Sequence, residues 1–297
     1  MFVDLLLILI IRALQQSLRI LPESVQLFKG KMLGRLAFLA LRSRRQVAIT
    51  NIKRVFPLLS DREITSIAKR NFEKLGINVI ELLLVSYLSR TEITKRFDVE
   101  GLEHFEEALN KGKGVIALTF HFANWEVEGI ASRLLNRDVI ALARPLKKHR
   151  LLNNFLNRLR ESAGLTIMVN ENVAQEVIRL LKENKVVVIL GDQREKRSRG
   201  VFVDFFGVKV STSKGMAMIG MKTGASVLPV YPVRKGFLRY TYVCGAPIEM
   251  ERGGNIEDLV AKNTRKINAF LETIILKYPD EWFWVHRRWG RREKSTE

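Results

Sequence analysis

The chain has 297 residues, enough to bury a full hydrophobic core, and its 50 lysines and arginines against 31 acidic residues give a net charge of +19. This excess predicts an anionic partner: a nucleic acid, an anionic membrane surface or an acidic protein. The single cysteine, Cys244, excludes a disulfide framework and a thiolate metal site. Because no two of the four histidines lie close together in the sequence, no metal site is expected.

The first forty residues are rich in large apolar side chains. The uninterrupted apolar run, Leu5 to Ile11, is shorter than the roughly 20 residues that a membrane-spanning helix needs. No small-residue cleavage site follows it, which argues against a signal peptide. Further leucines alternate with cations such as Arg19 and Lys29, a pattern typical of helices that lie in the membrane interface. For residues 35–41, a helix that packs on the protein's own core is an equal alternative.

Helical signals continue up to about residue 95. Ser60-Asp-Arg-Glu63 is a capping box, and apolar residues recur at helical spacing from Ile64 to Leu83. This spacing predicts one long helix or two stacked helices. We therefore expect residues 1–95 to form an N-terminal helical region that associates with a membrane.

From residue 96 onwards, short β-rich runs alternate with helical stretches. Strands are expected at 115–120, 139–143, 166–169, 186–190, 201–205, 227–233 and 240–244, and helices at 125–135, 151–162, 173–183, 214–222 and 256–277. This alternation predicts an α/β domain over residues 96–297, with a largely parallel or mixed central sheet flanked by helices. In such sheets, functional sites lie at the carboxyl ends of the strands.

The first candidate site follows the expected strand 115–120. This strand ends at His121, and Glu126 follows at the spacing His-x4-Glu. An imidazole that takes a proton needs a partner on its second nitrogen, and we expect Glu126 to be that partner and Asn124 to cap the following helix. The pair would activate a hydroxyl or a water molecule. The same spacing also arises by chance, in which case both residues are structural.

Other polar residues follow neighbouring strands. Asp192 ends the strand 186–190 in a position equivalent to that of His121, so both side chains are expected to project into one cleft, although a turn-forming role is the simpler interpretation of Asp192 alone. Arg144 ends the strand 139–143 at the same edge. Lys214 precedes a helix whose free N–H groups would bind an anionic oxygen, unless Ser211 or Ser213 caps it.

In their order along the chain, these motifs resemble the late acyltransferases of lipid A biosynthesis, the lauroyl and myristoyl transferase group. The resemblance covers nearly the whole chain. The matching segments are Arg44–Pro57, His121-x4-Glu126, Arg144-Pro145, Gly191-Asp-Gln193, Val201–Gly207, Gly224–Pro229 and Pro279–Arg288.

The resemblance implies a function and a set of site residues. The enzyme would transfer a fatty acyl group from acyl carrier protein to a hydroxyl of a lipid A precursor, a Kdo2-lipid IVA-type glycolipid, at the cytoplasmic face of the inner membrane and without a cofactor. His121 would be the general base, Glu126 its orienting acid, and Asp192 and Arg160 further catalytic residues. The acidic carrier protein and the anionic glycolipid would account for the positive charge.

The chemistry of such a transfer adds candidates for binding. A thioester already carries a good leaving group, so a base, orientation and an oxyanion donor suffice, and we expect direct transfer without an acyl-enzyme. Asn124, backbone N–H groups or Arg160 are candidate oxyanion donors. The full set of expected substrate-binding residues is Asn124, Arg144, Gln193, Arg194 and Lys214.

Two other readings stay open. The acceptor could be a phosphatidylinositol mannoside or a lysophospholipid. The chain could also be a non-catalytic basic protein that binds membranes, but it carries no recognisable nucleic-acid motif, so nucleic acid is not expected. His286 is the alternative to His121 as a catalytic histidine, but its aromatic and arginine neighbours favour a docking or interfacial tail.

Overall fold

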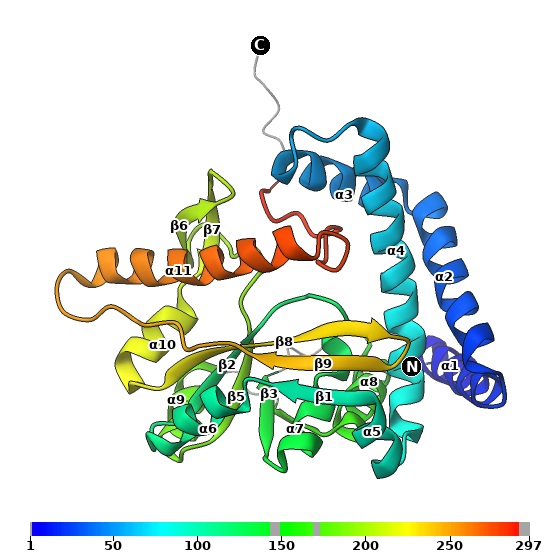
Figure 1. Cartoon of the computed structure of the whole chain (residues 1–297), viewed down its shortest axis with the longest axis horizontal. Coiled ribbons are helices and arrows are strands. Elements are labelled where there is room, and N and C mark those ends of the chain that lie inside the picture. The colour runs from blue at the N-terminus through cyan, green and yellow to red at the C-terminus, as the bar shows by residue number, and fades with distance from the viewer. Residues whose placement is uncertain (1, 143–148, 169–172, 291–297) are drawn as a thin grey trace.

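The computed structural model describes residues 2–142, 149–168 and 173–290. A mixed central sheet lies between helices on both faces, and the N-terminal helices stack against one end of it (Figure 1). The N-terminal elements are α1 (Phe2–Arg19), α2 (Glu23–Ala40), α3 (Arg42–Val55), α4 (Asp61–Leu84), the 3-10 turn Val85–Tyr87 and α5 (Arg90–Arg96). The α/β class predicted from the sequence is therefore confirmed.

Helix α4 is the central element of the N-terminal region. Its capping box is formed as predicted, with Ser60 Oγ accepting from Glu63 N and Glu63 Oε2 accepting from Ser60 N. A single long helix follows, rather than two stacked ones. The helix α2 packs directly on it, because a Cβ atom at Gly34 or Gly76 would overlap the backbone of the facing helix.

The main sheet has seven strands in the order β1-β9-β8-β2-β5-β3-β4. All neighbouring pairs are parallel except β8 and β9, which are antiparallel. The strands are β1 (Phe97–Glu100), β2 (Val115–Thr119), β3 (Val139–Leu142), β4 (Leu165–Met168), β5 (Val186–Leu190), β8 (Ser226–Gly236) and β9 (Arg239–Cys244). Because β2 is buried on both faces between β5 and β8, its carboxyl end opens at the centre of the sheet edge.

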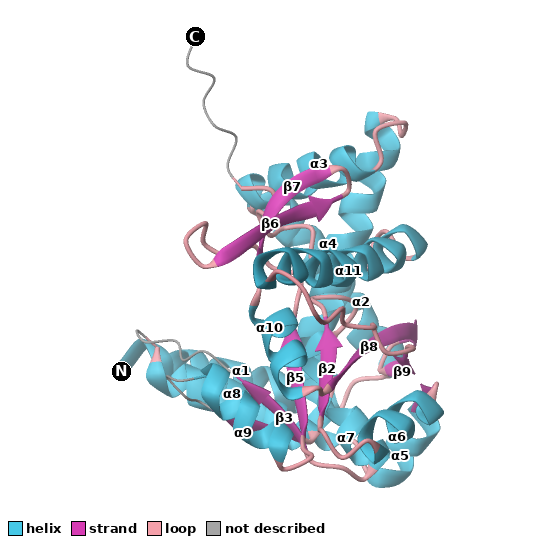
Figure 2. Ribbon diagram, turned by 90° about the vertical axis from the view of Figure 1, so that its left-hand side faces the viewer, coloured by secondary structure: helices cyan, strands magenta, loops and turns pink. Residues whose placement is uncertain are grey.

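Helices cover both faces of this sheet (Figure 1). One face carries α10 (Gly215–Thr223) and α11 (Ile256–Lys277), and the other carries α6 (Leu102–Asn110) and α7 (Gly129–Leu135). The helices α8 (Arg150–Ala163) and α9 (Val173–Lys182) lie beside β3, β4 and β5, and α1 packs on α8 (Figure 2). No helix in the described ranges is long and apolar enough to span a bilayer.

The strands β6 (Gly200–Phe205) and β7 (Val208–Ser213) form a separate antiparallel hairpin that lies against α11, apart from the main sheet (Figure 2). The sequence predicted β6 but missed β7 and β1. The strand β1 is only four residues long and alternates apolar and acidic residues, and β7 ends in the polar run Ser211-Thr-Ser213, so neither gives an apolar run. After α11 the chain passes between α11 and α4 without regular structure up to Gly290.

Candidate active site

His121 and Asp192 form the centre of the candidate site. His121 follows β2 and Asp192 follows β5, and because these parallel strands are neighbours, their carboxyl ends meet at one edge. The Nδ1 atom of His121 lies 2.7 Å from Oδ1 of Asp192. Asp192 Oδ2 accepts from the backbone N of His121 at 3.0 Å. With Nδ1 facing a carboxylate, Nε2 is the ring atom that can accept a proton.

Glu126 does not hold the imidazole, so the predicted pairing of these two residues is wrong. Its carboxylate instead accepts from Arg160 of α8, from Nε at 2.7 Å and from Nη2 at 3.0 Å. The chain after His121 does not enter a helix directly, since Ala123 adopts a left-handed conformation and residues 125–127 form a 3-10 turn. This turn aims Glu126 at α8 and leaves Nδ1 to Asp192.

The charges of this pair shift both pKa values. Burial of the His121 ring disfavours the imidazolium, but the charge and hydrogen bond of Asp192 outweigh it and hold the pKa of His121 above its ordinary value. Burial also opposes ionisation of Asp192, but the charge of His121 and the donated hydrogen bonds keep its pKa below the usual range. Asp192 is therefore an ionised carboxylate at neutral pH.

Aromatic rings and one amide enclose the imidazole. Trp125 meets the ring edge-on at 5.1 Å between centroids, and Phe283 stacks on it at 5.8 Å. The exposed side chain of Gln193 reaches the ring, with its Nε2 at 3.0 Å from His121 Nε2. Gln193 thus occupies the position from which a hydroxyl would donate its proton.

The other predicted binding residues are less central. Arg194 and Lys214 are exposed, and Lys214 directly precedes α10. The first N–H of α10, from Gly215, binds Ser213 Oγ at 3.4 Å, whereas Ser211 is buried. Arg144 lies outside the described residues.

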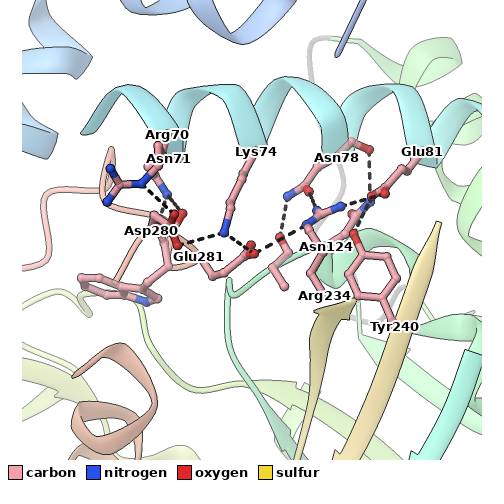
Figure 3. A network of polar contacts seen from close by, with 12 residues as sticks. Arg70, Asn71, Lys74, Asn78, Glu81, Asn124, Arg234, Tyr240, Asp280 and Glu281 are labelled. Atoms are coloured by element: carbon pink, nitrogen blue, oxygen red, sulfur yellow. Dashed lines mark hydrogen bonds and ion pairs between the residues drawn. The ribbon is translucent and has the colours of Figure 1, made fainter. Parts of the chain in front are cut away.

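Asn124 differs from its predicted roles as a helix cap and an oxyanion donor. It is fully buried and makes no side-chain cap bond. Its Nδ2 donates to Glu81 Oε2 of α4 at 2.8 Å (Figure 3). The amide therefore ties the loop after β2 to α4 in the protein interior.

The segment after α11 contributes to the site in a way that the sequence did not predict. The indole Nε1 of Trp282 donates to Asp192 Oδ2 at 2.9 Å, and Phe283 N donates to His121 O at 2.9 Å. Arg288 is fully buried, and burial lowers its pKa to about 10. Trp282 and Arg288 are therefore part of the core beneath the site, in contrast to the predicted interfacial tail.

A partly buried polar network on α4 anchors this segment (Figure 3). Lys74 bridges Asp280 at 2.8 Å and Glu281 at 2.6 Å, and Asn71 Nδ2 donates to Trp282 O at 2.7 Å. Pairing and hydrogen bonds of this kind compensate charges for the hydration that they lose. Helix α4 and the segment after α11 thus meet directly behind the candidate site.

A small apolar cavity lies on the α6 and α7 face, next to the strand end that carries His121. Thr119, two residues before His121, lines it together with Glu128. Thr119 Oγ1 donates to Glu128 Oε1, and burial raises the pKa of Glu128 well above its usual range. Burial thus favours the neutral form of Glu128 in this wall. The remaining lining residues are Phe105, Ala117, Ala131, Leu135, Val139, Val186, Val188, Val230 and Tyr242.

Within the described part of the chain, no group of His, Cys, Asp or Glu side chains is arranged to hold a metal ion. The groups that the site does present are the imidazole of His121, the carboxylates of Asp192 and Glu126, and the guanidinium of Arg160. Together they form a base held by an acid, with an ion pair beside it.

Comparisons with known proteins identify the family of the chain. The profile of the family described as bacterial lipid A biosynthesis acyltransferase matches residues 4–291. The chain is similar to the lipid A biosynthesis palmitoleoyltransferase of Escherichia coli K12, with 29% identity over 92% of this chain and 87% of the relative. It is also similar to the lipid A biosynthesis lauroyltransferase of the same organism, with 25% identity over 93% of this chain and 89% of the relative.

A more distant similarity covers only half of the chain. The phosphatidylinositol mannoside acyltransferase of Mycobacterium tuberculosis H37Rv is 28% identical over 51% of this chain and 49% of the relative. The family profile, by contrast, spans both the N-terminal helices and the α/β sheet. The chain therefore belongs to the bacterial lipid A biosynthesis acyltransferase family.

Proposed function

We propose that the protein transfers a fatty acyl group from the thioester of acyl carrier protein to a hydroxyl of a lipid A precursor of the Kdo2-lipid IVA type. The observation that carries the proposal is the contact of His121 Nδ1 with Asp192 Oδ1 at 2.7 Å, which leaves Nε2 as the proton acceptor. Membership of the family supports acyl transfer to lipid A. The donor and the catalytic role of His121 are our inference.

The reaction begins when the acceptor hydroxyl replaces Gln193 at His121 Nε2. The hydroxyl gives its proton to Nε2 as its oxygen attacks the thioester carbonyl, and Asp192 stabilises the imidazolium that forms. General-base catalysis of this kind supplies on the order of 10² to 10⁴ in rate. The tetrahedral intermediate then expels the thiolate, which takes the proton from His121, so that an ester and a free thiol result.

No other group is needed to complete this cycle. The thiolate is a good leaving group, and the proton returns to it from the same imidazole, so we propose direct transfer without a cofactor. Gln193 Nε2 is released when the hydroxyl binds and becomes a candidate donor to the oxyanion.

The N-terminal helices support a site at the membrane. In α1 the usual arrangement is inverted, since Asp4 and Gln15 are buried while Leu9 and Ile10 are 64% and 55% exposed. Asp4 accepts from His149 Nδ1 at 2.8 Å, and Gln15 donates to Leu83 O at 3.0 Å. Apolar side chains that point outward and polar ones that point inward suit a lipid surround. We propose that these helices bind the cytoplasmic face of the inner membrane.

The outward face of α2 extends this apolar surface. It carries exposed large side chains opposite the face that packs on α4; they are Phe28, Met32, Leu33, Leu36 and Leu39. Exposed cations lie closer to the active site, where they would meet the carrier protein and the phosphorylated glycolipid. These cations are Arg194, Lys196, Arg199 and Lys214.

The test is transfer by the purified full chain. Mass spectrometry of the products should show acylation of Kdo2-lipid IVA by acyl carrier protein thioesters and none by His121→Ala. Parallel reactions with a phosphatidylinositol mannoside and a lysophospholipid test the other acceptors, of which the mannoside has the support of the half-chain similarity. Preferred acylation of either one would contradict the proposed acceptor, and transfer by His121→Ala would contradict the proposed base.

A further inference from the structure

We propose that Trp282 is a positioning residue for the pair His121 and Asp192, an inference that rests on the proposed function. Its indole Nε1 donates to Asp192 Oδ2 at 2.9 Å, and the side chain is 1% exposed. The same Oδ2 accepts from the backbone N of His121, while Oδ1 faces the ring at Nδ1. The indole therefore completes the set of donors that fixes the plane of the carboxylate.

The backbone around Trp282 is joined to the loop that carries His121. Phe122 and Trp282 form an antiparallel bridge, Phe283 N donates to His121 O at 2.9 Å, and Ala123 N donates to Glu281 O at 2.9 Å. These contacts bind the two segments over three consecutive residues. A displacement of the indole would therefore move the imidazole as well.

Two further elements hold the indole from outside this bridge. Asn71 of α4 donates to Trp282 O at 2.7 Å. On the side of the hairpin, the ring of Phe205 lies 5.7 Å from the indole, and Trp289 lies 6.2 Å from it, both edge-on. Such support gives a polar side chain the fixed geometry that an active site requires.

The hydrogen bond from the indole to Asp192 lowers the pKa of His121. The N–H dipole of the indole places its positive end at the carboxylate and so weakens the hold of Asp192 on an imidazolium. Loss of this donor raises the pKa of His121. The charged and titratable groups that act on this site come from every surrounding element and stay in place in the variants below; they are Asp192, Glu126, Glu128, Arg160, His286, Arg288 and Arg44.

The experiment compares Trp282→Phe with a matched variant, Trp284→Phe. Trp284 is also fully buried in the same segment and packs edge-on against Trp282 at 4.8 Å, but its Nε1 donates to Pro279 O at 2.6 Å and not to Asp192. Trp284→Phe therefore tests the loss of aromatic packing at Trp282 without loss of the hydrogen bond to Asp192. For Trp282→Phe, kcat/KM should fall on the order of tenfold, far less than the roughly 10⁴-fold loss when an orienting carboxylate itself is neutralised. In the pH profile of kcat/KM for this variant, the acid limb should move up by about half a pH unit. Trp284→Phe should keep the acid limb of the wild type.

A second measurement separates this inference from the proposed function. The ¹⁵N shifts of the His121 ring, titrated by NMR in the free protein, should show the higher pKa in Trp282→Phe alone. If the wild type failed to acylate a lipid A precursor but the NMR shift remained, the proposed function would fall and the positioning role would stand. Equal pKa values in wild type and Trp282→Phe would overturn the positioning role.

A third variant covers the case in which Trp282→Phe does not fold. Benzothienylalanine at position 282 keeps the shape of the indole and replaces its N–H by sulfur, so it removes the hydrogen bond to Asp192 with little change in packing. It should give the same upward shift of the His121 pKa. An unchanged pKa in this folded variant would likewise overturn the inference.

Discussion

Arg160 donates two hydrogen bonds, of 2.7 and 3.0 Å, to the carboxylate of Glu126 and so holds this acid away from His121. Bidentate pairs of this type are the strong and directional form of the interaction between arginine and a carboxylate. The spacing His-x4-Glu therefore brings a base and an ion pair side by side. Asp192, more than 70 positions from His121 in the chain, supplies the carboxylate that the base needs.

The first prediction follows from this division of roles. Asp192→Asn replaces the carboxylate by an amide, which neither stabilises the imidazolium by charge nor imposes the same ring tautomer. We expect kcat to fall by about 10³ to 10⁴. Steady-state kinetics with saturating acyl donor measures this loss. A fall of less than tenfold would mean that Asp192 does not orient the base.

The pairing of Glu126 with Arg160 predicts non-additive effects. Once either partner is replaced, the other has lost its contact. The double variant Glu126→Gln with Arg160→Gln should therefore lose little more free energy of unfolding than either single variant. A double-mutant cycle on the free energy of unfolding should give a coupling of about 0.5 to 2 kcal/mol for this partly exposed pair. Additive effects would show that the two side chains act independently in solution.

The raised pKa of His121 predicts opposite pH dependences for activity and stability. A general base acts in its neutral form, so kcat/KM should rise with pH through a pKa above the ordinary value of 6.5. The stability contributed by the pair of His121 and Asp192 is fully present below that ordinary value and is lost as the pH rises through the folded-state pKa. At the acid end, it is lost as the pH falls through the lowered pKa of Asp192.

Two measurements on the same samples check these slopes. The pH profile of kcat/KM should have an acid limb that His121→Ala removes along with the activity. Chemical unfolding of the wild type should give a free energy that decreases across the pH range in which activity increases, and His121→Ala should flatten that decrease. Parallel rises of activity and stability would contradict the assigned protonation states.

Gln193 gives a test of the geometry at Nε2. Its amide lies 3.0 Å from the atom that the acceptor hydroxyl needs, and it is exposed and able to move away. Gln193→Leu removes the donor but keeps the bulk, so it should lower kcat through the loss of an oxyanion donor, by roughly 10² if Gln193 supplies one. Gln193→Glu should instead raise the His121 pKa by its charge. An unchanged kcat in Gln193→Leu would assign the oxyanion to backbone donors.

The meeting of His121 and Asp192 could be predicted from the sequence because one general rule governs it. Residues that end neighbouring parallel strands share an edge of the sheet, and the apolar runs of β2 and β5 are unbroken. The helices α10 and α11 also matched their predicted ranges closely, since their patterns are long or clearly bounded by glycine. Local periodicity thus sufficed for the strands and helices with long or unbroken apolar patterns and for this pair.

The remaining partners could not be predicted, because they depend on contacts between distant segments. Whether Glu126 turns toward His121 or α8 is decided by the left-handed Ala123 and the 3-10 turn, and neither leaves a pattern in the sequence. Trp282 approaches Asp192 from a segment without regular structure. The only local signal was the dense aromatic run from Trp282 to Trp289, which fits a core as well as an interface.

The exposed apolar surface of α1 and α2 predicts lipid binding that a charge can disrupt. Leu9 and Leu36 are 64% and 56% exposed on α1 and α2, and Ile256, at the start of α11, is 60% exposed. Leu9→Glu with Leu36→Glu should reduce cosedimentation with liposomes of anionic phospholipid by at least about tenfold, because each glutamate places a charge where apolar surface would leave water. Ile256→Glu, the matched control, should bind as the wild type does.

The wild type, the double variant and the control should all acylate a detergent-dispersed acceptor at similar rates, because none of the substituted side chains contacts His121 or Asp192. Equal liposome binding by the double variant and the control would assign the apolar face to another partner, and a dimer in light scattering that the double variant abolishes would identify that partner as a second copy of the chain.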